Sequence, residues 1–254
     1  MMTPTDKKEE EAMYSLGYNT RTGKNTVRKR SVIKRMKGYW NWRIEKPLYH
    51  IYGINYSFLN RYFAIGGMKL RYFINRYNAV RSERVVEIPF ALNQLGEESQ
   101  SGILEVGNVL SHYRNVSYDI VDKYEVGKGI INIDILDYNP GRKYRKIISI
   151  STVEHIGFDE PVREKGKAEK AITKIYDLLE ANGTAIITVP LAYNPEIDDI
   201  IKNKKIEFHK AYFMKRVGLF NLWKETTLDG ALTRKHGSRY MHTNAIALLV
   251  LKKP

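Results

Sequence analysis

The sequence contains no cysteine, and this absence removes several classes of protein from consideration. A chain without thiols has no disulfide framework, no thiolate metal site and no cysteine nucleophile. A reducing compartment is compatible with such a chain, and we predict a cytoplasmic protein.

Long apolar runs are also missing. A membrane-spanning helix needs about 18 or more consecutive apolar residues. The nearest candidate, residues 49–74, is interrupted by polar and charged residues: Asn55, Asn60, Arg61, Lys69 and Arg71. The first residues, MMTPTDKKEEEA, are polar and differ from the apolar centre of a signal peptide. We therefore expect neither a transmembrane segment nor a secretory signal.

Acidic residues are fewer than basic ones, 28 against 42, which gives a formal net charge of +14. The excess is uneven, because residues 1–48 hold 12 Lys/Arg against 5 Asp/Glu and so carry half of it. A segment of this kind can bind nucleic acid, anionic lipid head groups or a phosphorylated substrate. A solvated, partly disordered tail is an equally good interpretation.

The chain as a whole has the composition of a folded protein. Its 254 residues are 43% hydrophobic and 11% aromatic, enough for one substantial core. We predict a disordered tail over residues 1–26, a basic, aromatic and mainly helical region over 27–100, and an α/β domain over 101–254. Within the middle region we expect a helix over 27–48 and one or two helices over 49–79, broken at Gly66-Gly67.

After residue 101 the pattern changes to short apolar runs separated by turn residues. Runs that are apolar on both faces are typical of parallel strands covered by helices on both sides. Six runs fit this description: 102–106, 118–121, 129–133, 146–151, 184–189 and 244–251. Residues 219–226 and the last of these runs are expected to form an antiparallel strand pair.

One helix is clear within this domain. Apolar residues recur at helical spacing over 167–181, and Asn182-Gly183 is a typical helix stop before the next strand. Strand, helix and strand in this order form a βαβ unit. The fold class predicted is therefore α/β, with a mostly parallel central sheet flanked by helices.

The segment with the strongest functional signal is Ile103-Leu104-Glu105-Val106-Gly107-Asn108. An apolar strand ends in an acidic residue, and a glycine follows where the chain must turn. Glycine lets the backbone approach a ligand closely, and ligands of open α/β sheets bind beyond the carboxyl ends of the strands.

This segment resembles the first motif of the class I S-adenosylmethionine-dependent methyltransferase superfamily, and the downstream elements follow in the same order. The matching stretches are YDIVD at 118–122, IDI at 133–135, IISISTVEHI at 147–156 and LLEANGT at 178–184. The run ISTVEHIGFDEP, with VDKYE and TVPLAYNP, is similar to an uncharacterised, methyltransferase type 11-like branch. The resemblance covers residues 101–254 and implies a Rossmann-like methyltransferase fold.

The resemblance also implies a set of residues that hold S-adenosylmethionine. Asp122 matches the ribose acceptor, and Asp134 matches the acceptor of the adenine amino group. The full cofactor-binding set is Glu105, Gly107, Asn108, Asp122, Asp134, Ile135 and Ser151.

Two departures from the family pattern concern the first half of the sheet. Only 15 residues separate Gly107 from Asp122, and only 12 separate Asp122 from Asp134, too few for full helices between the strands. Glu125 is therefore an alternative ribose acceptor. In addition, Arg145-Lys146 stands where the family often has an acidic residue.

His155 and Glu154 are the candidate catalytic residues. Just past a central strand, an imidazole can take a proton from an acceptor hydroxyl near neutral pH. Glu154 can orient His155 or act as the base itself, and both can instead simply begin a helix beside the pocket. Asp159 and Glu160 are expected to open the following helix, and we expect no resident metal.

The function predicted is methyl transfer from S-adenosylmethionine, chiefly O-methylation of a small-molecule or glycan acceptor, one with negative charge being favoured by the basic N-terminal region. RNA methylation, with RNA bound by that region, is one alternative. A non-catalytic binding protein on this scaffold is another. A nicotinamide-dependent oxidoreductase is disfavoured because the turn lacks the three-glycine fingerprint. The oligomeric state is not predicted.

Overall fold

The computed structural model describes residues 61–74, 82–96, 100–218, 221–237 and 243–254, together with residue 59 and the short strands β1 (Tyr18–Asn19) and β2 (Lys24–Asn25). β1 and β2 pair with each other in antiparallel fashion. The helix predicted over 27–48 lies outside the described residues. No helix in the described ranges is long and apolar enough to cross a bilayer.

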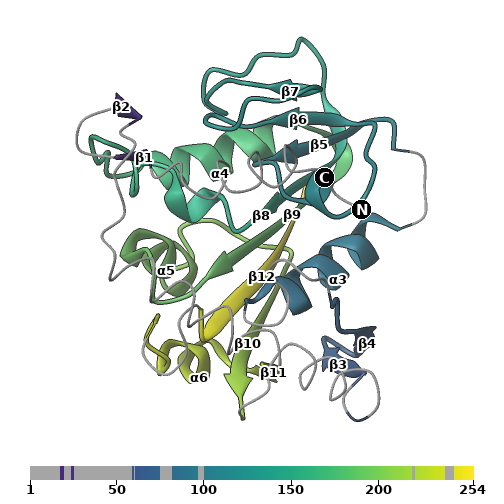
Figure 1. Ribbon diagram of the computed structural model, residues 1–254, viewed down its shortest axis with the longest axis vertical. Coiled ribbons are helices and arrows are strands. Elements are labelled where there is room, and N and C mark those ends of the chain that lie inside the picture. Colours follow the sequence, from purple (N-terminus) through teal and green to yellow (C-terminus); the bar gives the residue numbers. More distant parts are fainter. Residues whose placement is uncertain are drawn as a thin grey trace, which may run out of the picture.

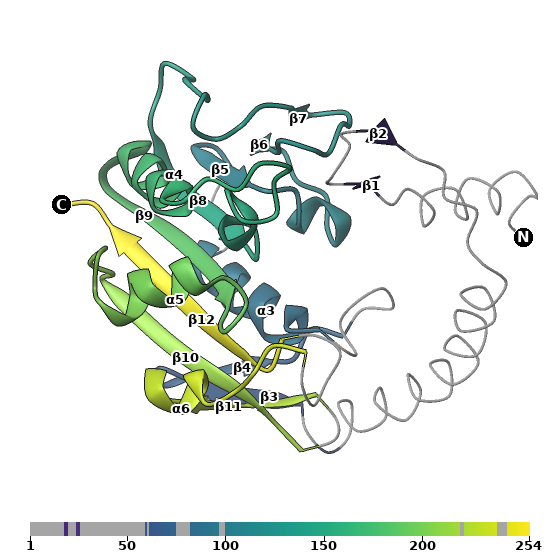
Figure 2. The ribbon, with the colours of Figure 1, turned by 90° about the vertical axis from the view of Figure 1, so that its left-hand side faces the viewer.

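Eight strands form the central sheet, in the order β11-β10-β12-β9-β8-β5-β6-β7. Their bounds are β5 Ile103–Val106, β6 Asp119–Val121, β7 Ile130–Ile131, β8 Tyr144–Ile150, β9 Leu179–Pro190, β10 Lys210–Val217, β11 Leu222–Thr226 and β12 Ala245–Lys252. The five strands from β9 to β7 are parallel, whereas β12 runs antiparallel to both β9 and β10. In Figure 2 the strands follow one another from β7 at the top to β11 at the bottom.

Helices cover both faces of this sheet, and Figure 1 shows the three layers with the sheet near its edge. The helices are α3 Arg84–Leu95, α4 Lys167–Asp177, α5 Pro195–Lys202 and α6 Leu228–Leu232, with short 3-10 turns η2 Leu110–His112 and η3 Val153–His155. Apolar side chains of α4, α5 and α6 pack on one face. α3 and the hairpin β3 (Tyr62–Ile65) and β4 (Met68–Arg71) pack on the other. The predicted Rossmann-like α/β fold with a mostly parallel, helix-flanked sheet is confirmed.

All six apolar runs predicted as strands are strands. The antiparallel end of the sheet is also present, but β11 and β12 do not pair directly, because β10 lies between them. The sequence does not predict β10, because the lysines and the arginine of this strand fall on both of its faces. Arg216 is buried there.

Of the helices expected over 49–79, the part over residues 61–74 is wrong, because the chain forms strands there. Residues 62–65 alternate exposed and buried side chains with a period of two, which is the pattern of a strand. Gly66 and Gly67 both have positive φ, 53° and 77°, and form the tight turn between β3 and β4. The two glycines connect strands and do not break a helix.

The helix predicted over 167–181 ends earlier, at Asp177. The N–H of Tyr144 donates to the carbonyl of Leu178 over 2.9 Å, so the chain already joins the sheet there. Asn182-Gly183 therefore lies inside β9, next to a register irregularity opposite Tyr144 and Lys146.

The first half of the sheet contains few helices, as the short spacing between Gly107, Asp122 and Asp134 predicted. Between β5 and β8 the chain forms only the 3-10 turn η2 and no α-helix. Polar turns instead connect these strands, and they leave a hollow at the carboxyl ends of β5 and β6.

Lys146 stands where the family often has an acidic residue, and its contacts give it a structural role. Its ammonium group donates to the carbonyls of Leu95, over 2.5 Å, and Gln94, over 3.2 Å, at the C-terminal end of α3. A cation at this end satisfies carbonyls that have no partner within the helix.

We expect Lys146→Met to lower the free energy of unfolding by about 1 kcal/mol, because two helix-end carbonyls lose their donor. Urea denaturation measures this change. Lys128→Met, at an exposed position before β7, is the control and should have little effect. Equal stability of the two variants would contradict the capping role.

Candidate functional site

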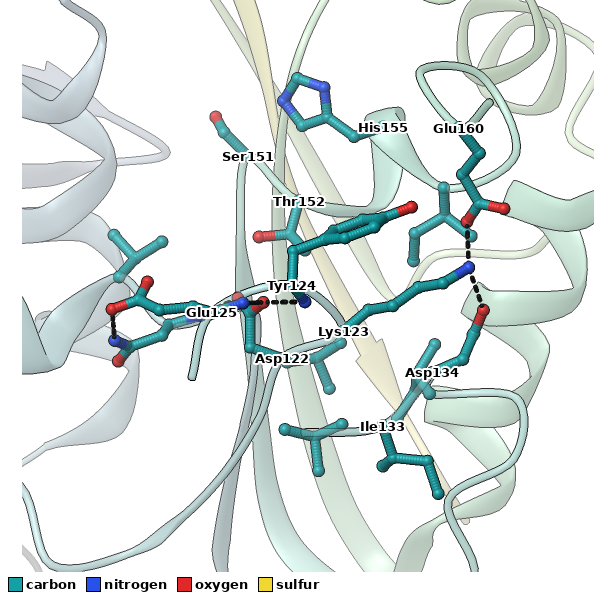
Figure 3. A pocket seen from close by; sticks show the side chains of 17 residues that line it. Asp122, Lys123, Tyr124, Glu125, Ile133, Asp134, Ser151, Thr152, His155 and Glu160 are labelled. Atoms are coloured by element: carbon teal, nitrogen blue, oxygen red, sulfur yellow. Dashed lines mark hydrogen bonds and ion pairs between the residues drawn. The ribbon is translucent and has the colours of Figure 1, made fainter. Parts of the chain in front are cut away.

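A cavity of about 380 Å³ opens at the carboxyl ends of β5, β6 and β8. β5 leads to β6 on one side and has β8 on the other, so this is the point where the order of the parallel strands reverses. Open α/β sheets bind ligands at such a point, and the volume lies in the range of small-molecule sites. Figure 3 shows the side chains of the wall, most of which come from the loops after these strands.

Gly107 begins the loop after β5 with φ of 86°. Its N–H donates to the carbonyl of Val121 over 2.8 Å. A Cβ at this position would lie 2.1 Å from Oγ1 and 2.6 Å from Cγ2 of Thr152. The loop after β5 is thus pressed against the loop after β8, and only glycine allows both the conformation and the approach.

Glu105 is fully buried and does not line the cavity. Its carboxylate accepts from the N–H groups of Val109 and Leu110, over 2.9 and 2.7 Å, and from the hydroxyl of Tyr118 over 3.0 Å. Burial raises the pKa of Glu105, and these hydrogen bonds partly oppose that shift. Glu105 therefore fixes the shape of the loop that carries Gly107 and Asn108, while its predicted role toward the cofactor stays a prediction.

Asp122 and Glu125 both line the cavity, so the two candidate ribose acceptors lie in one turn after β6. Asp122 accepts from the backbone N–H groups of Asn108, Tyr124 and Glu125, over 2.9, 2.8 and 2.7 Å. Glu125 accepts from the side-chain amide of Asn108 over 2.7 Å, and its other carboxylate oxygen lies 3.3 Å from Nε2 of His112. Asp122 thus ties the two loops together, whereas Glu125 has fewer internal partners.

Asp134 and Ile135 line the cavity at the end that the resemblance assigns to adenine. Asp134 forms ion pairs with Lys123 and Lys167, each over 2.9 Å, and Glu160 pairs with the same two lysines. In Figure 3 the Lys123 side chain reaches to a point between the carboxylates of Asp134 and Glu160. We call these four residues the charge network.

The charge network makes the stability of the protein depend on pH. Burial by itself raises the pKa of Asp134 and Glu160, but their bonds with Lys123 and Lys167 outweigh it and lower both pKa values below the ordinary 3.8 and 4.5. A lowered carboxyl pKa stabilises the fold above the ordinary value, and this contribution is lost as the pH falls through the lowered value.

We expect Lys167→Met to be less stable than the wild type at pH 7 and to lose less stability between about pH 5 and pH 3, because the carboxyls lose one cation. Thermal unfolding across this pH range measures both effects. Lys170→Met is the matched control, since the partner of Lys170 among the described residues is the exposed Glu164. A wild-type pH dependence in the Lys167 variant would contradict the network's role.

His155 lines the cavity from η3. Its Nδ1 hydrogen-bonds to the carboxylate of Asp159, which also accepts from the hydroxyl of Tyr193. The ring of Tyr193 meets the imidazole edge to face, with centroids 5.3 Å apart. Asp159 and Tyr193 therefore hold the imidazole ring in place, and Nε2 takes no part in these contacts.

Glu154 is buried and is not part of the cavity wall. Its carboxylate Oε1 lies 3.5 Å from Nε2 of His155, and burial raises its pKa well above the ordinary value. Its carbonyl accepts from the side chain of Asn194 over 2.8 Å. Ser151 does line the cavity, with φ of 41°, and its hydroxyl donates to Glu87 over 2.6 Å.

The structure thus brings Gly107, Asn108, Asp122, Asp134, Ile135, Ser151 and His155 to one cavity and leaves Glu105 and Glu154 behind its wall. The expectation that Asp159 and Glu160 open a helix is wrong, because α4 begins only at Lys167. Lys123, Lys167 and Glu87 were not predicted as site residues from the sequence. An isolated lysine or glutamate carries no signal of its own in a single sequence.

Comparison with known proteins finds similarity only among solved structures. No family model matches the sequence, and no curated protein matches it. An rRNA methylase from Streptococcus thermophilus is 15% identical over 72% of this chain and 99% of its own, with a TM-score of 0.41. A putative methyltransferase from Thermoplasma acidophilum is 16% identical over 59% and 67%, with a TM-score of 0.32. The N-methyltransferase NodS from Bradyrhizobium japonicum, in complex with S-adenosyl-L-homocysteine, is 10% identical over 60% and 77%, with a TM-score of 0.33.

Proposed function

We propose that this protein is an S-adenosylmethionine-dependent methyltransferase that methylates a hydroxyl group of a small-molecule or glycan acceptor. The proposal rests on where the motif residues lie. The residues that match the family's motifs for methionine, ribose and adenine come from three separate loops, yet Gly107, Asp122 and Asp134 line the same cavity at the switch point of the sheet.

The residues of the cavity fit this cofactor. Gly107 keeps the first loop close to Thr152, so that the backbone of Gly107 and Asn108 forms the floor for the amino-acid part. Carboxylates in the turn after β6 are natural acceptors for the two ribose hydroxyls, and Glu125 has the greater capacity left. The apolar side chains of Ile133 and Ile135 offer a surface for the adenine ring.

S-adenosylmethionine, held by the loops of Gly107, Asp122 and Asp134, would supply a methyl group on a positively charged sulfur for transfer to the acceptor oxygen, with S-adenosylhomocysteine as the leaving group. His155 would receive the hydroxyl proton at Nε2. Asp159 bonds with Nδ1 and so favours the tautomer in which Nδ1 carries the proton and Nε2 can act as a base. The chain's main contribution is to position the acceptor in line with the methyl carbon.

Titration calorimetry with S-adenosylmethionine, S-adenosylhomocysteine and NAD tests the proposal. We expect both sulfur compounds to bind with a dissociation constant of about micromolar order, and NAD not to compete. Absence of binding by either sulfur compound would favour the non-catalytic alternative.

The alternative of RNA methylation rests on residues 27–84, most of which lie outside the described residues. It predicts RNA binding whose affinity falls steeply as the salt concentration rises.

A further inference from the structure

The charge network lies at one end of the cavity, and its two lysines differ in their surroundings. The side chain of Lys167, on α4, is 9% exposed, whereas that of Lys123, in the turn after β6, is 35% exposed. Lys123 lines the cavity and Lys167 does not. Figure 3 shows the Lys123 side chain extended through the site toward Asp134 and Glu160. Of the two cations, Lys123 is therefore the one that a bound ligand can meet.

Lys167 by itself can hold both carboxylates of the network. Its ammonium group lies 2.9 Å from Oδ2 of Asp134 and donates to both oxygens of Glu160, over 3.1 and 2.8 Å. Lys123 contacts the same Oδ2 of Asp134 over 2.9 Å and Oε1 of Glu160 over 3.0 Å. When Lys123 turns toward a ligand, neither carboxylate is left without a cation. Lys123 is thus the replaceable member of the network.

Asp134 has little capacity for a further donor while Lys123 is in place. Its Oδ2 receives both ammonium groups, and its Oδ1 accepts from the backbone N–H of Leu136 over 3.1 Å. The family resemblance assigns the amino group of adenine to this carboxylate. A neutral amino group competes poorly with an ammonium group for a carboxylate oxygen, because charge-assisted hydrogen bonds are about twice as strong as neutral ones.

An ammonium group beside a carboxylate is complementary to two kinds of purine. Adenine carries an amino group at position six, which donates, and a ring nitrogen next to it, which accepts. A 6-oxopurine carries a carbonyl at position six, which accepts and is a common partner of lysine, and a ring N–H next to it, which donates. The ion pair of Lys123 and Asp134 offers one donor and one acceptor and so matches either edge. A carboxylate alone would match adenine and reject the carbonyl.

We propose that Lys123 determines the base specificity of the site, and that its pair with Asp134 lets the protein bind S-adenosyl and S-inosyl compounds with similar affinity. This inference rests on the proposed function, which places the purine at this end of the cavity, and adds a second class of cofactor to it. With the amino compound, Asp134 accepts from the amino group and Lys123 donates to the ring nitrogen. With the 6-oxo compound, Lys123 donates to the carbonyl and Asp134 accepts from the ring N–H.

Titration calorimetry with three homocysteine thioethers that differ at position six of the purine tests the proposal. S-adenosylhomocysteine carries an amino group there, S-inosylhomocysteine a carbonyl, and the purine-riboside analogue a hydrogen atom. We expect the wild type to bind the first two within about fivefold of each other. The third should bind about tenfold more weakly, because it lacks the group that the ion pair contacts.

Variants of Lys123 test whether this lysine is the cause. Lys123→Met is expected to weaken the binding of S-inosylhomocysteine about tenfold or more, because the carbonyl then loses its donor and faces a carboxylate. The affinity for S-adenosylhomocysteine should change by less than about threefold. Lys123→Arg keeps a cationic donor and should retain both affinities. Lys128→Met, at an exposed position in the same connection between β6 and β7, is the matched control and should behave as the wild type.

The proposal is overturned if S-inosylhomocysteine binds the wild type more than about fivefold more weakly than S-adenosylhomocysteine, or if all three compounds bind equally. It is also overturned if Lys123→Met weakens both natural bases alike. Should that variant not fold, the three wild-type affinities decide. Binding of S-adenosylhomocysteine without S-inosylhomocysteine contradicts the base specificity and leaves the proposed function standing, whereas binding of neither contradicts both.

Discussion

Gly107→Ala is expected to abolish measurable binding of S-adenosylmethionine, with a loss of affinity of about a hundredfold or more. The new Cβ would lie 2.1 Å from Oγ1 of Thr152, and the backbone is held at φ of 86°. The loop after β5 must then move away from the loop after β8, and with it the floor of the cavity. Titration calorimetry of the folded variant measures the effect.

A matched control separates the collision from simple backbone strain. Gly129 has almost the same conformation, with φ of 82°, but a Cβ there meets nothing within 4 Å. Gly129→Ala should therefore lose some stability and keep its affinity. Adding Thr152→Ala to Gly107→Ala removes the two atoms that approach most closely and should restore part of the binding. Unchanged affinity in Gly107→Ala would show that this loop does not form the cofactor site.

His155→Ala is expected to reduce methyl transfer by about a hundredfold to ten-thousandfold, the usual range for loss of a general base. Affinity for S-adenosylmethionine should change little, because the predicted cofactor contacts come mainly from other loops. Release of S-adenosylhomocysteine with a methylated acceptor, measured beside the calorimetric affinity, separates the two effects.

His209→Ala, at an exposed position outside the cavity, is the control for this variant. It should retain full activity. Asp159→Asn should fall between the two, because the ring of His155 loses the carboxylate at Nδ1 but keeps the contact with Tyr193. Full activity of His155→Ala would refute the base role, and parallel losses of transfer and affinity would make His155 a binding residue.

The fold of the α/β domain was largely predictable from the sequence, because buried parallel strands are apolar on both faces and stand out as runs. β8 and β12 were found in this way. β10 was not, because its charged residues, Lys210, Lys215 and Arg216, fall on both faces of the strand and its place in the sheet depends on β12, about thirty to forty residues later. The hairpin of β3 and β4 was missed for a different reason: aromatic and basic residues there also fit a helix, and only the paired positive φ angles of Gly66 and Gly67 decide between the two.

The position of the candidate site could be predicted from the sequence, whereas the contacts between its residues could be predicted less well. A glycine turn after the first strand and acidic residues after the next two mark the edge of a sheet where ligands bind. What a carboxylate does there depends on its partners. Asp134 meets Lys167, and Glu87 meets Thr188, across more than thirty and one hundred residues of sequence. A single sequence contains no information on such pairs, so the charge network became visible only in three dimensions.

A crystal structure of the protein with S-adenosylhomocysteine is the most direct test of the proposed function. We expect the ligand in the cavity after β5, β6 and β8, with its amino-acid part against Gly107, its ribose at the turn of Asp122 and Glu125, and its adenine beside Ile135. A ligand bound elsewhere, or a protein that does not bind it at millimolar concentration, would contradict the central claim.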